Sequence, residues 1–132
     1  MTPVVVDTDV VSFLFKDDSR AQLYLPFMRN RDLLISFMTE AELEQWILLA
    51  KWGADRVRRF RFFMTRFASV PSSRDLILQW AEVMVAAKAN GRRVEAADAW
   101  IAATALLYRA ALITHNPKDY VGLPNLRVFS CP

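Results

Sequence analysis

The chain has 132 residues, of which 54% are hydrophobic and 23% are charged, and its formal net charge is +3 at pH 7. This composition excludes a disordered chain and is sufficient for the core of one domain. The single cysteine, Cys131, excludes an internal disulfide, so we expect a reducing, cytoplasmic location. The apolar run near the N-terminus is too short for a signal peptide, and the one at residues 101–113 is too short to span a membrane. The small basic excess is compatible with an anionic substrate.

Short apolar runs alternate with segments of helical periodicity, which predicts βαβ units. The expected fold class is therefore α/β, with a central parallel sheet of about four or five strands flanked by helices. Strands are predicted at residues 4–6, 33–37, 68–70, 112–114 and 127–129. The chain has no Ser- or Gly-rich linker and no internal repeat, so residues 1–132 are predicted to form a single domain.

The first helices are predicted from apolar spacing and from capping residues. Two short helices are expected at residues 10–15 and 21–28, the second capped by Ser19. A longer helix is expected at residues 39–52, and the next one carries apolar residues at helical spacing between residues 57 and 67.

The second half of the chain contains the clearest amphipathic pattern. Its stripe consists of Leu76, Ile77, Trp80, Val83, Met84 and Ala87. Asp98 is predicted to begin an Ala-rich helix that continues through Leu106. The pair Asn116-Pro117 marks a turn after a strand.

Four acidic residues, Asp7, Glu42, Asp98 and Asp119, follow predicted strands or begin a predicted helix. Each has a purely structural explanation. Asp7 suits the N-cap of the helix that follows it, and Glu42 forms a capping-box pattern with Thr39. Asp98 suits the first turn of its helix through the helix dipole, and Asp119 suits a turn.

Helix capping does not require these four acids to share one edge of the sheet, yet the predicted topology places them there. Strand ends and helix starts of this kind lie on one side of a parallel α/β sheet, where ligands bind. Converging carboxylates repel each other unless a cation lies between them, and their oxygens suit Mg²⁺ or Mn²⁺. Glu40 and Glu44 flank Glu42, while Asp9 and Glu95 are bystanders or auxiliaries.

Other chemistries have little support in the sequence. Any Ser-His-Asp triad or acid–base histidine chemistry would have to use the only histidine, His115, and a lone histidine is more often a surface or core residue than a catalyst. No Cys/His cluster suits zinc, and no Gly-rich loop suits a nucleotide phosphate. The basic stretch at residues 56–66 is interpreted as a solvated helix face, and the smaller Arg92-Arg93 pair is a candidate for holding a substrate phosphate.

Four short blocks surround the acids, at residues 5–9, 36–43, 98–105 and 114–120. In sequence and in order they resemble the PIN-domain nucleases, in particular the VapC-like ribonuclease toxins of bacterial type II toxin–antitoxin pairs. The resemblance covers almost the whole chain, and its second block, with an acid before a leucine, selects Glu42. Three positions depart from the family pattern: Asp9 replaces Asn, Ser or Thr, Gln45-Trp46 replaces a small residue, and Tyr120 replaces Phe.

This resemblance implies a metal-dependent endoribonuclease that leaves a 5′-phosphate and a 3′-hydroxyl. The catalytic and metal-binding residues would be Asp7, Glu42, Asp98 and Asp119, with Mg²⁺ or Mn²⁺ as the cofactor. Glu42 would bind the metal directly or through water. Thr8 and Asn116 would orient ligands or water, and Asp9 would either add a carboxylate or only form hydrogen bonds.

The resemblance also implies a cognate antitoxin protein as partner and a homodimer. An aromatic-rich set of helices offers grooves for an amphipathic antitoxin helix, although each residue alone suits the core. The set is Phe13, Phe15, Trp46, Trp52, Phe60 and Phe63.

Two alternatives are compatible with the same residues. The block that begins at Asp7 is also similar to the opening of haloacid-dehalogenase-like phosphatases, whose first Asp is a nucleophile. A clear downstream Lys and a paired-Asp block are missing from this chain. The other alternative is a PIN-fold interaction domain without catalysis, against which the intact acids argue.

Overall fold

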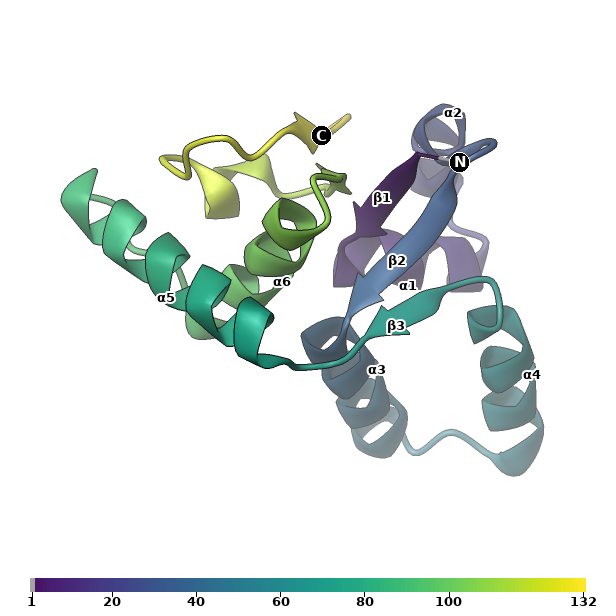
Figure 1. Cartoon of the computed structure of the whole chain (residues 1–132). Helices are drawn as coiled ribbons and strands as arrows, with labels where there is room; N and C mark the ends of the chain where they lie inside the picture. Colours follow the sequence, from purple (N-terminus) through teal and green to yellow (C-terminus); the bar gives the residue numbers. More distant parts are fainter. Residues whose placement is uncertain (1) are drawn as a thin grey trace.

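A parallel sheet forms the centre of the molecule, whose structure is a computed structural model that describes residues 2–132. Within this range the strands are β1 (Pro3–Val6), β2 (Asp32–Ser36), β3 (Ala68–Val70), β4 (Ala111–Ile113) and β5 (Val128–Phe129). Their order in the sheet is β3-β2-β1-β4-β5, and every neighbouring pair is parallel (Figure 1). The strand order reverses at β1, so the topological switch point lies between β1 and β4. The predicted α/β class and parallel sheet are confirmed.

Helices connect these strands and cover both faces of the sheet. The α-helices are α1 (Thr8–Lys16), α2 (Leu25–Met28), α3 (Phe37–Ala50), α4 (Ala54–Met64), α5 (Arg74–Ala89) and α6 (Ala96–Leu107). Two 3₁₀ helices, η1 (Ser19–Leu23) and η2 (Pro117–Tyr120), complete the described elements. No helix of residues 2–132 is long and apolar enough to cross a membrane.

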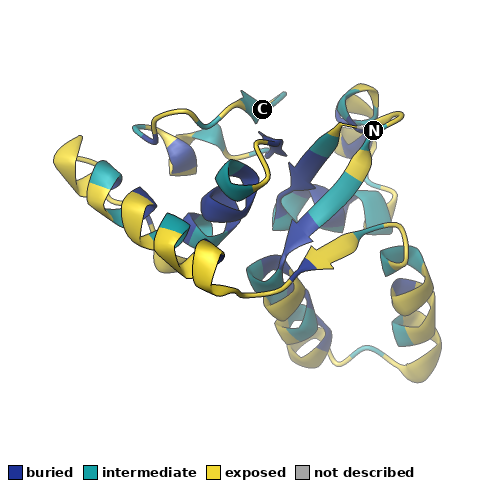
Figure 2. Cartoon of the chain, viewed as in Figure 1, coloured by how far each residue is buried: buried dark blue, intermediate teal, exposed yellow. Residues whose placement is uncertain are grey.

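Side-chain alternation along the strands divides the core into two layers. Val5 and Leu112 belong to the layer that contains residues of α5 and α6. Val4, Val6 and Ile113 belong to the layer that contains residues of α1, α3 and α4. Because both faces are covered, the central strands are continuously apolar rather than alternating. α6 is mostly buried, whereas α5 leaves much of its outer surface exposed (Figure 2).

Two elements near the N-terminus differ from the prediction. α1 begins earlier than predicted because Asp7, in an extended conformation, caps it and accepts a hydrogen bond from the Thr8 amide at 2.8 Å. The helix predicted at residues 21–28 is instead η1 followed by the short α2. The cap of η1 is Asp18, so the prediction that Ser19 caps this segment is wrong.

α3 begins at Phe37, which was predicted to belong to the preceding strand. Ser36 caps the helix, and its hydroxyl accepts a hydrogen bond from the Met38 amide at 3.0 Å. Thr39 therefore lies inside the helix, and its predicted capping box with Glu42 is wrong. The carboxylate of this glutamate is consequently not used in capping α3.

The second half of the chain also differs in detail. α6 begins at Ala96, so Asp98 lies in its first turn rather than beginning the helix. The predicted stripe of α5 is confirmed at Leu76 and Val83, which are buried, whereas Ile77 is 44% exposed. Ile77 follows Leu76 by about 100° around the helix axis and falls outside the buried face of α5.

Candidate active site

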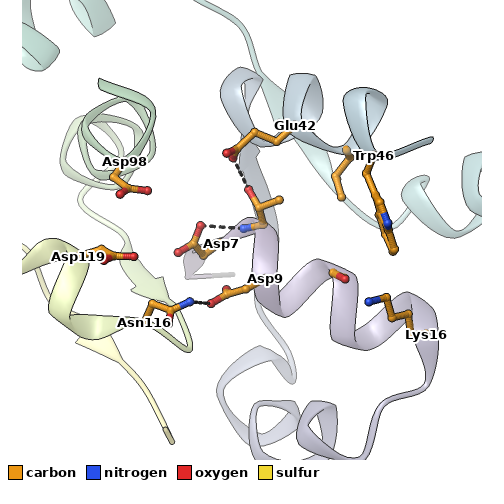
Figure 3. Close-up of a pocket in the computed structure, with 11 residues that line it drawn as sticks. Asp7, Asp9, Lys16, Glu42, Trp46, Asp98, Asn116 and Asp119 are labelled. Atoms are coloured by element: carbon orange, nitrogen blue, oxygen red, sulfur yellow. Dashed lines mark hydrogen bonds between the residues drawn. The ribbon is translucent and has the colours of Figure 1, made fainter. Parts of the chain in front are cut away.

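The predicted site residues line one cavity of about 390 Å³ (Figure 3). They are Asp7, Thr8, Asp9, Glu42, Asp98, Asn116 and Asp119. The four carboxylates of the predicted catalytic set come from the end of β1, from α3, from the first turn of α6 and from η2. They lie beyond the carboxyl ends of the strands at the switch point, where open α/β sheets bind ligands. The structure thus brings all seven residues together.

Asp7 is held in one orientation by hydrogen bonds to both of its carboxylate oxygens. It is only 7% exposed. Oδ1 accepts from the Thr8 amide at 2.8 Å, and Oδ2 accepts from the hydroxyls of Thr114 at 2.7 Å and Tyr120 at 2.9 Å. Thr114 and Tyr120 were not among the predicted site residues. Because β1 and β4 pair in parallel register, the residues that follow them are neighbours, which is the signal that could have identified Thr114.

Glu42 is oriented by a threonine of the neighbouring helix. The Thr8 hydroxyl donates to Oε1 of Glu42 at 2.7 Å. The hydroxyl oxygens of Thr8 and Thr39 lie 2.9 Å apart, so the buried Thr39 in turn supports Thr8. This chain of hydroxyls joins the start of α1 to α3.

The flanking glutamates of α3 have partners outside the cavity. Glu40 accepts a hydrogen bond from the Ser69 hydroxyl. Glu44 forms an ion pair with Arg61 at 2.6 Å. Among the three, only Glu42 lines the cavity, which agrees with its selection by the family pattern.

Asp9 connects α1 to the loop that leads to Asp119. Its Oδ1 accepts from the Val10 amide at 2.7 Å. Its Oδ2 accepts from the His115 amide at 3.1 Å and from Nδ2 of Asn116 at 2.7 Å. Both oxygens of Asp9 thus accept hydrogen bonds from the chain, as both oxygens of Asp7 do, and Asp9 also lines the cavity.

Burial and mutual repulsion raise the pKa values of Asp7, Asp9, Glu42 and Asp98. Burial, followed by the charges of Asp7 and Asp119, raises the pKa of Asp98 to about 7. Burial and then the charge of Asp7 raise the pKa of Asp9 to about 6. Burial also raises the pKa of Asp7 and of Glu42, against the hydrogen bonds that each accepts. A cation in the cavity would relieve this repulsion.

The cavity suits a hard divalent cation by the chemistry of its donors, because it offers carboxylate oxygens and no sulfur or imidazole. Within residues 2–132, however, no three or more Asp, Glu, His or Cys side chains are already arranged to hold an ion. The case for a divalent cation in this cavity therefore rests on the carboxylate oxygens and their negative charge.

The basic side chain in the cavity is not one of those predicted. Neither Arg92 nor Arg93 is among the described residues that line it, and Arg93 is exposed with a long ion pair to Glu95 at 3.9 Å. Lys16 lines the cavity instead, together with Trp46. The spacing between Thr8 and Lys16 could have identified Lys16, because residues eight apart on a helix lie close to one face.

Comparison with known families decides the classification of the chain. A family model described as the PIN domain matches residues 4–120. The chain belongs to the PIN-domain family. The match includes all four predicted catalytic acids and the block that begins at Asp7, and thereby favours this family over the haloacid-dehalogenase-like phosphatases.

This PIN domain also resembles individual proteins over nearly its full length. It is 26% identical over 125 residues to Ribonuclease VapC1 of Haemophilus influenzae strain R2866, which covers 93% of each chain. Among solved structures it matches VapBC-1 from nontypeable Haemophilus influenzae with a TM-score of 0.82 and 25% identity, over 98% of both chains. It matches a toxin–antitoxin complex from Klebsiella pneumoniae with a TM-score of 0.76 and 26% identity, over 96% of this chain and 95% of that one.

Proposed function

We propose that this PIN domain is a metal-dependent endoribonuclease and the toxin of a type II toxin–antitoxin pair. The observation that carries the proposal is the convergence of four carboxylates, from four chain segments, on one cavity at the switch point of the sheet. The similarity to a ribonuclease over 93% of both chains supports RNA as the substrate.

In this proposal Asp7, Asp98 and Asp119 hold Mg²⁺ or Mn²⁺, and Glu42 binds it directly or through water. The bound ion supplies an activated water and stabilises the charge that gathers on the cleaved phosphate. Hydrogen bonds from Thr114 and Tyr120 orient the Asp7 carboxylate, and a hydrogen bond from Thr8 orients Glu42. These hydrogen bonds leave Asp7 and Glu42 few alternative orientations, so less conformational freedom is lost when the metal and RNA bind.

Cleavage of RNA by the wild type and by Asp98→Asn tests the catalytic assignment. We expect cleavage in Mg²⁺ or Mn²⁺, none in EDTA, and loss of at least about 100-fold in the variant, because a ligand charge is removed. The wild-type products should carry 5′-phosphates when their ends are sequenced, and the same data identify the target RNA.

Two controls accompany that experiment. Glu95→Gln removes an exposed acid near the same helix start and should cleave as the wild type does. Circular dichroism should show that both variants are folded. Full activity of Asp98→Asn would refute the catalytic assignment.

Metal binding separates this proposal from a non-catalytic PIN domain. We expect isothermal titration with Mn²⁺ to give a binding isotherm for the wild type and a much weaker one for Asp98→Asn. Absence of binding to the folded wild type would favour an interaction domain without catalysis.

The partners expected for such a toxin are an antitoxin protein and a second copy of the chain, in the cytoplasm. The antitoxin is supported by the toxin–antitoxin complexes among the similar structures. Of the six aromatic residues suggested as its docking groove, two are buried in the core, Phe13 and Phe60, and four are only partly buried: Phe15, Trp46, Trp52 and Phe63. A monomer in gel filtration at micromolar concentration would contradict the homodimer.

A further inference from the structure

The cavity extends beyond the carboxylates along two helices. α1 contributes Thr8, Ser12 and Lys16, which are spaced four residues apart, and α3 contributes Glu42 and Trp46 with the same spacing. At one end Thr8 donates a hydrogen bond to Glu42. At the other end the Lys16 ammonium lies 4.9 Å from the centre of the Trp46 ring. Figure 3 shows this second end on the side of the cavity away from the acids of α6 and η2.

Lys16 gives this second end a different chemical character. It is the only basic side chain among the described residues that line the cavity. No salt bridge joins it to another of residues 2–132. Because an α-helix rises 1.5 Å per residue, Lys16 lies about 12 Å along α1 from Thr8. The cavity thus changes from acidic to cationic and aromatic over a distance that a short stretch of single strand can span.

Trp46 presents a large flat ring at this end of the cavity. Trp52 packs against it edge-on, with ring centres 4.6 Å apart and planes inclined by 68°. The Lys16 ammonium lies over the face of the Trp46 ring. The lysine stem has four rotatable carbons, so a nearby phosphate can draw the ammonium away and leave the ring face open.

We propose that Lys16 and Trp46 form a binding site for a nucleotide of single-stranded RNA a short distance along the strand from the cleaved phosphodiester. Lys16 donates to a phosphate oxygen, and the ring of Trp46 stacks on an unpaired base. A paired base is not free to stack on a side chain, so the site selects single-stranded RNA over duplex RNA. This site rests on the proposed ribonuclease function and adds its mode of substrate binding.

The phosphate contact is tested in an Asp98→Asn background, which prevents cleavage. Binding of a short fluorescent single-stranded RNA is measured by anisotropy at several salt concentrations. We expect Lys16→Ala to weaken binding about tenfold and to reduce the slope of log affinity against log salt by about 0.7, the loss of one phosphate contact on a single strand. Lys16→Arg should retain binding. The matched control Lys88→Ala removes the same charge from α5, outside the cavity, and should change neither quantity.

The stacking contact is tested in the same background with substitutions of Trp46. Trp46→Leu should weaken binding roughly tenfold, within the range measured for base–aromatic stacking, and Trp46→Phe should have a smaller effect. RNA should quench tryptophan fluorescence, and Trp46→Phe should abolish most of the quenching. The control Trp80→Phe, at a ring that stacks on Trp100 elsewhere, should leave the quenching unchanged. Duplex RNA should bind more weakly and without dependence on Trp46.

Steady-state cleavage by the single variants separates the two proposals. With Asp98 intact, Lys16→Ala and Trp46→Leu should raise KM and leave kcat nearly unchanged, because they remove binding that is equal in the ground and transition states. If the wild type cleaves RNA and neither variant changes affinity or KM, this binding site is refuted and the ribonuclease stands. If the wild type neither cleaves nor binds RNA, both fail. If Trp46→Leu does not fold, Trp46→Phe and Lys16→Ala decide the outcome.

Discussion

At the scale of single residues, Asp7 shows how one carboxylate caps a helix and lines the candidate site at the same time. Its Oδ1 caps α1 through the Thr8 amide, and its Oδ2 receives the hydroxyls of Thr114 and Tyr120. Burial and the charge of the Asp7 carboxylate also raise the pKa of Tyr120, which keeps that hydroxyl protonated as a donor. A helix-cap explanation and a site explanation of the same acid are therefore compatible.

Removing one donor from Asp7 tests how far its orientation matters. We expect Tyr120→Phe to lower the free energy of unfolding by about 1–2 kcal/mol, because a buried acceptor loses a partner. RNA cleavage should fall roughly tenfold, a loss typical of outer-shell contacts to metal ligands. Urea unfolding and the cleavage rate measure the two effects. Tyr108→Phe, at a residue that is 46% exposed, is the matched control and should change neither. Equal cleavage by both variants would contradict the orienting role.

The raised pKa values of Asp98 and Asp9 give the metal-free protein a distinctive pH dependence. Their folded-state pKa values, about 7 and about 6, exceed the value of about 3.9 for an unfolded Asp. Between these limits the folded state binds more protons than the unfolded state, so stability falls as pH rises. The contribution of each group is complete below about pH 4 and is lost as pH passes its folded pKa.

The predicted fall in stability with rising pH is testable by thermal unfolding in EDTA. We expect the wild type to be less stable at about pH 8 than at about pH 5. Asp98→Asn should be more stable than the wild type by roughly 1 kcal/mol at the higher pH, a value that allows for screening of a half-exposed group, and nearly equal at the lower pH. Asp75→Asn, which removes an exposed acid from the first turn of α5, is the control and should not be stabilising. A wild type that gains stability up to pH 8 would contradict this account.

Those site residues were predictable from the sequence whose position follows from their residue type and from the end of a strand. Asp7 and Asp119 follow strands, and ligands of open α/β sheets bind beyond the carboxyl ends of the strands. Lys16 and Trp46 were not predicted as site residues, because their position depends on which faces of α1 and α3 meet. Arg92 was favoured by its nearness in sequence to the acid of α6, but sequence distance does not give side-chain direction.

At the scale of elements, the site depends on strands that pass directly into helices. Asp7 alone separates β1 from α1, and Ser36 both ends β2 and caps α3. Such short junctions fix the direction of the following helix relative to the sheet edge. They also explain why the helices begin a few residues before their predicted starts. The apolar periodicity used for the prediction begins only at the first core residue, which in α1 is Val10.

The cap of α3 offers a test of this dependence. Ser36→Ala and Ser73→Ala each remove a side-chain hydrogen bond to a helix N-terminus and should each lower stability by about 1 kcal/mol. We expect only Ser36→Ala to slow RNA cleavage, because α3 carries Glu42 and α5 carries no cavity residue. Urea unfolding and cleavage rates measure both effects. Equal cleavage by the two variants would show that the start of α3 does not position the site.

At the scale of the whole molecule, the fold holds together groups that repel each other. Apolar packing on both faces of the sheet brings the ends of β1 and β4 beside α3 and α6. The acids cluster because of that packing, and burial raises the pKa values of Asp7 and Asp98, so we expect the charged cluster to oppose folding when no cation is bound. This convergence depends on the strand order. The sequence predicted a parallel α/β sheet but not the order of its strands, because short strands do not specify their neighbours.

Metal binding should therefore act on the stability of the entire domain. An ion that binds only the folded chain at 100 times its dissociation constant adds about 2.7 kcal/mol, or roughly 8–13 °C in Tm for a domain of this size. We expect Mn²⁺ to raise Tm of the wild type, and to do so more at about pH 8 than at about pH 6, because protons compete with the ion for the Asp98 carboxylate. Differential scanning fluorimetry with Mn²⁺ and with EDTA measures both.

The same experiment on Asp98→Asn should reverse the order of stability. In EDTA at pH 8 the variant lacks a repelled charge and should melt above the wild type. In Mn²⁺ it lacks a ligand, so the wild type should melt above the variant. A crossing of this kind requires that one carboxylate both opposes folding and binds the ion, which a helix-dipole role for Asp98 does not produce. Equal Mn²⁺ shifts in the two proteins would remove Asp98 from the ligand set.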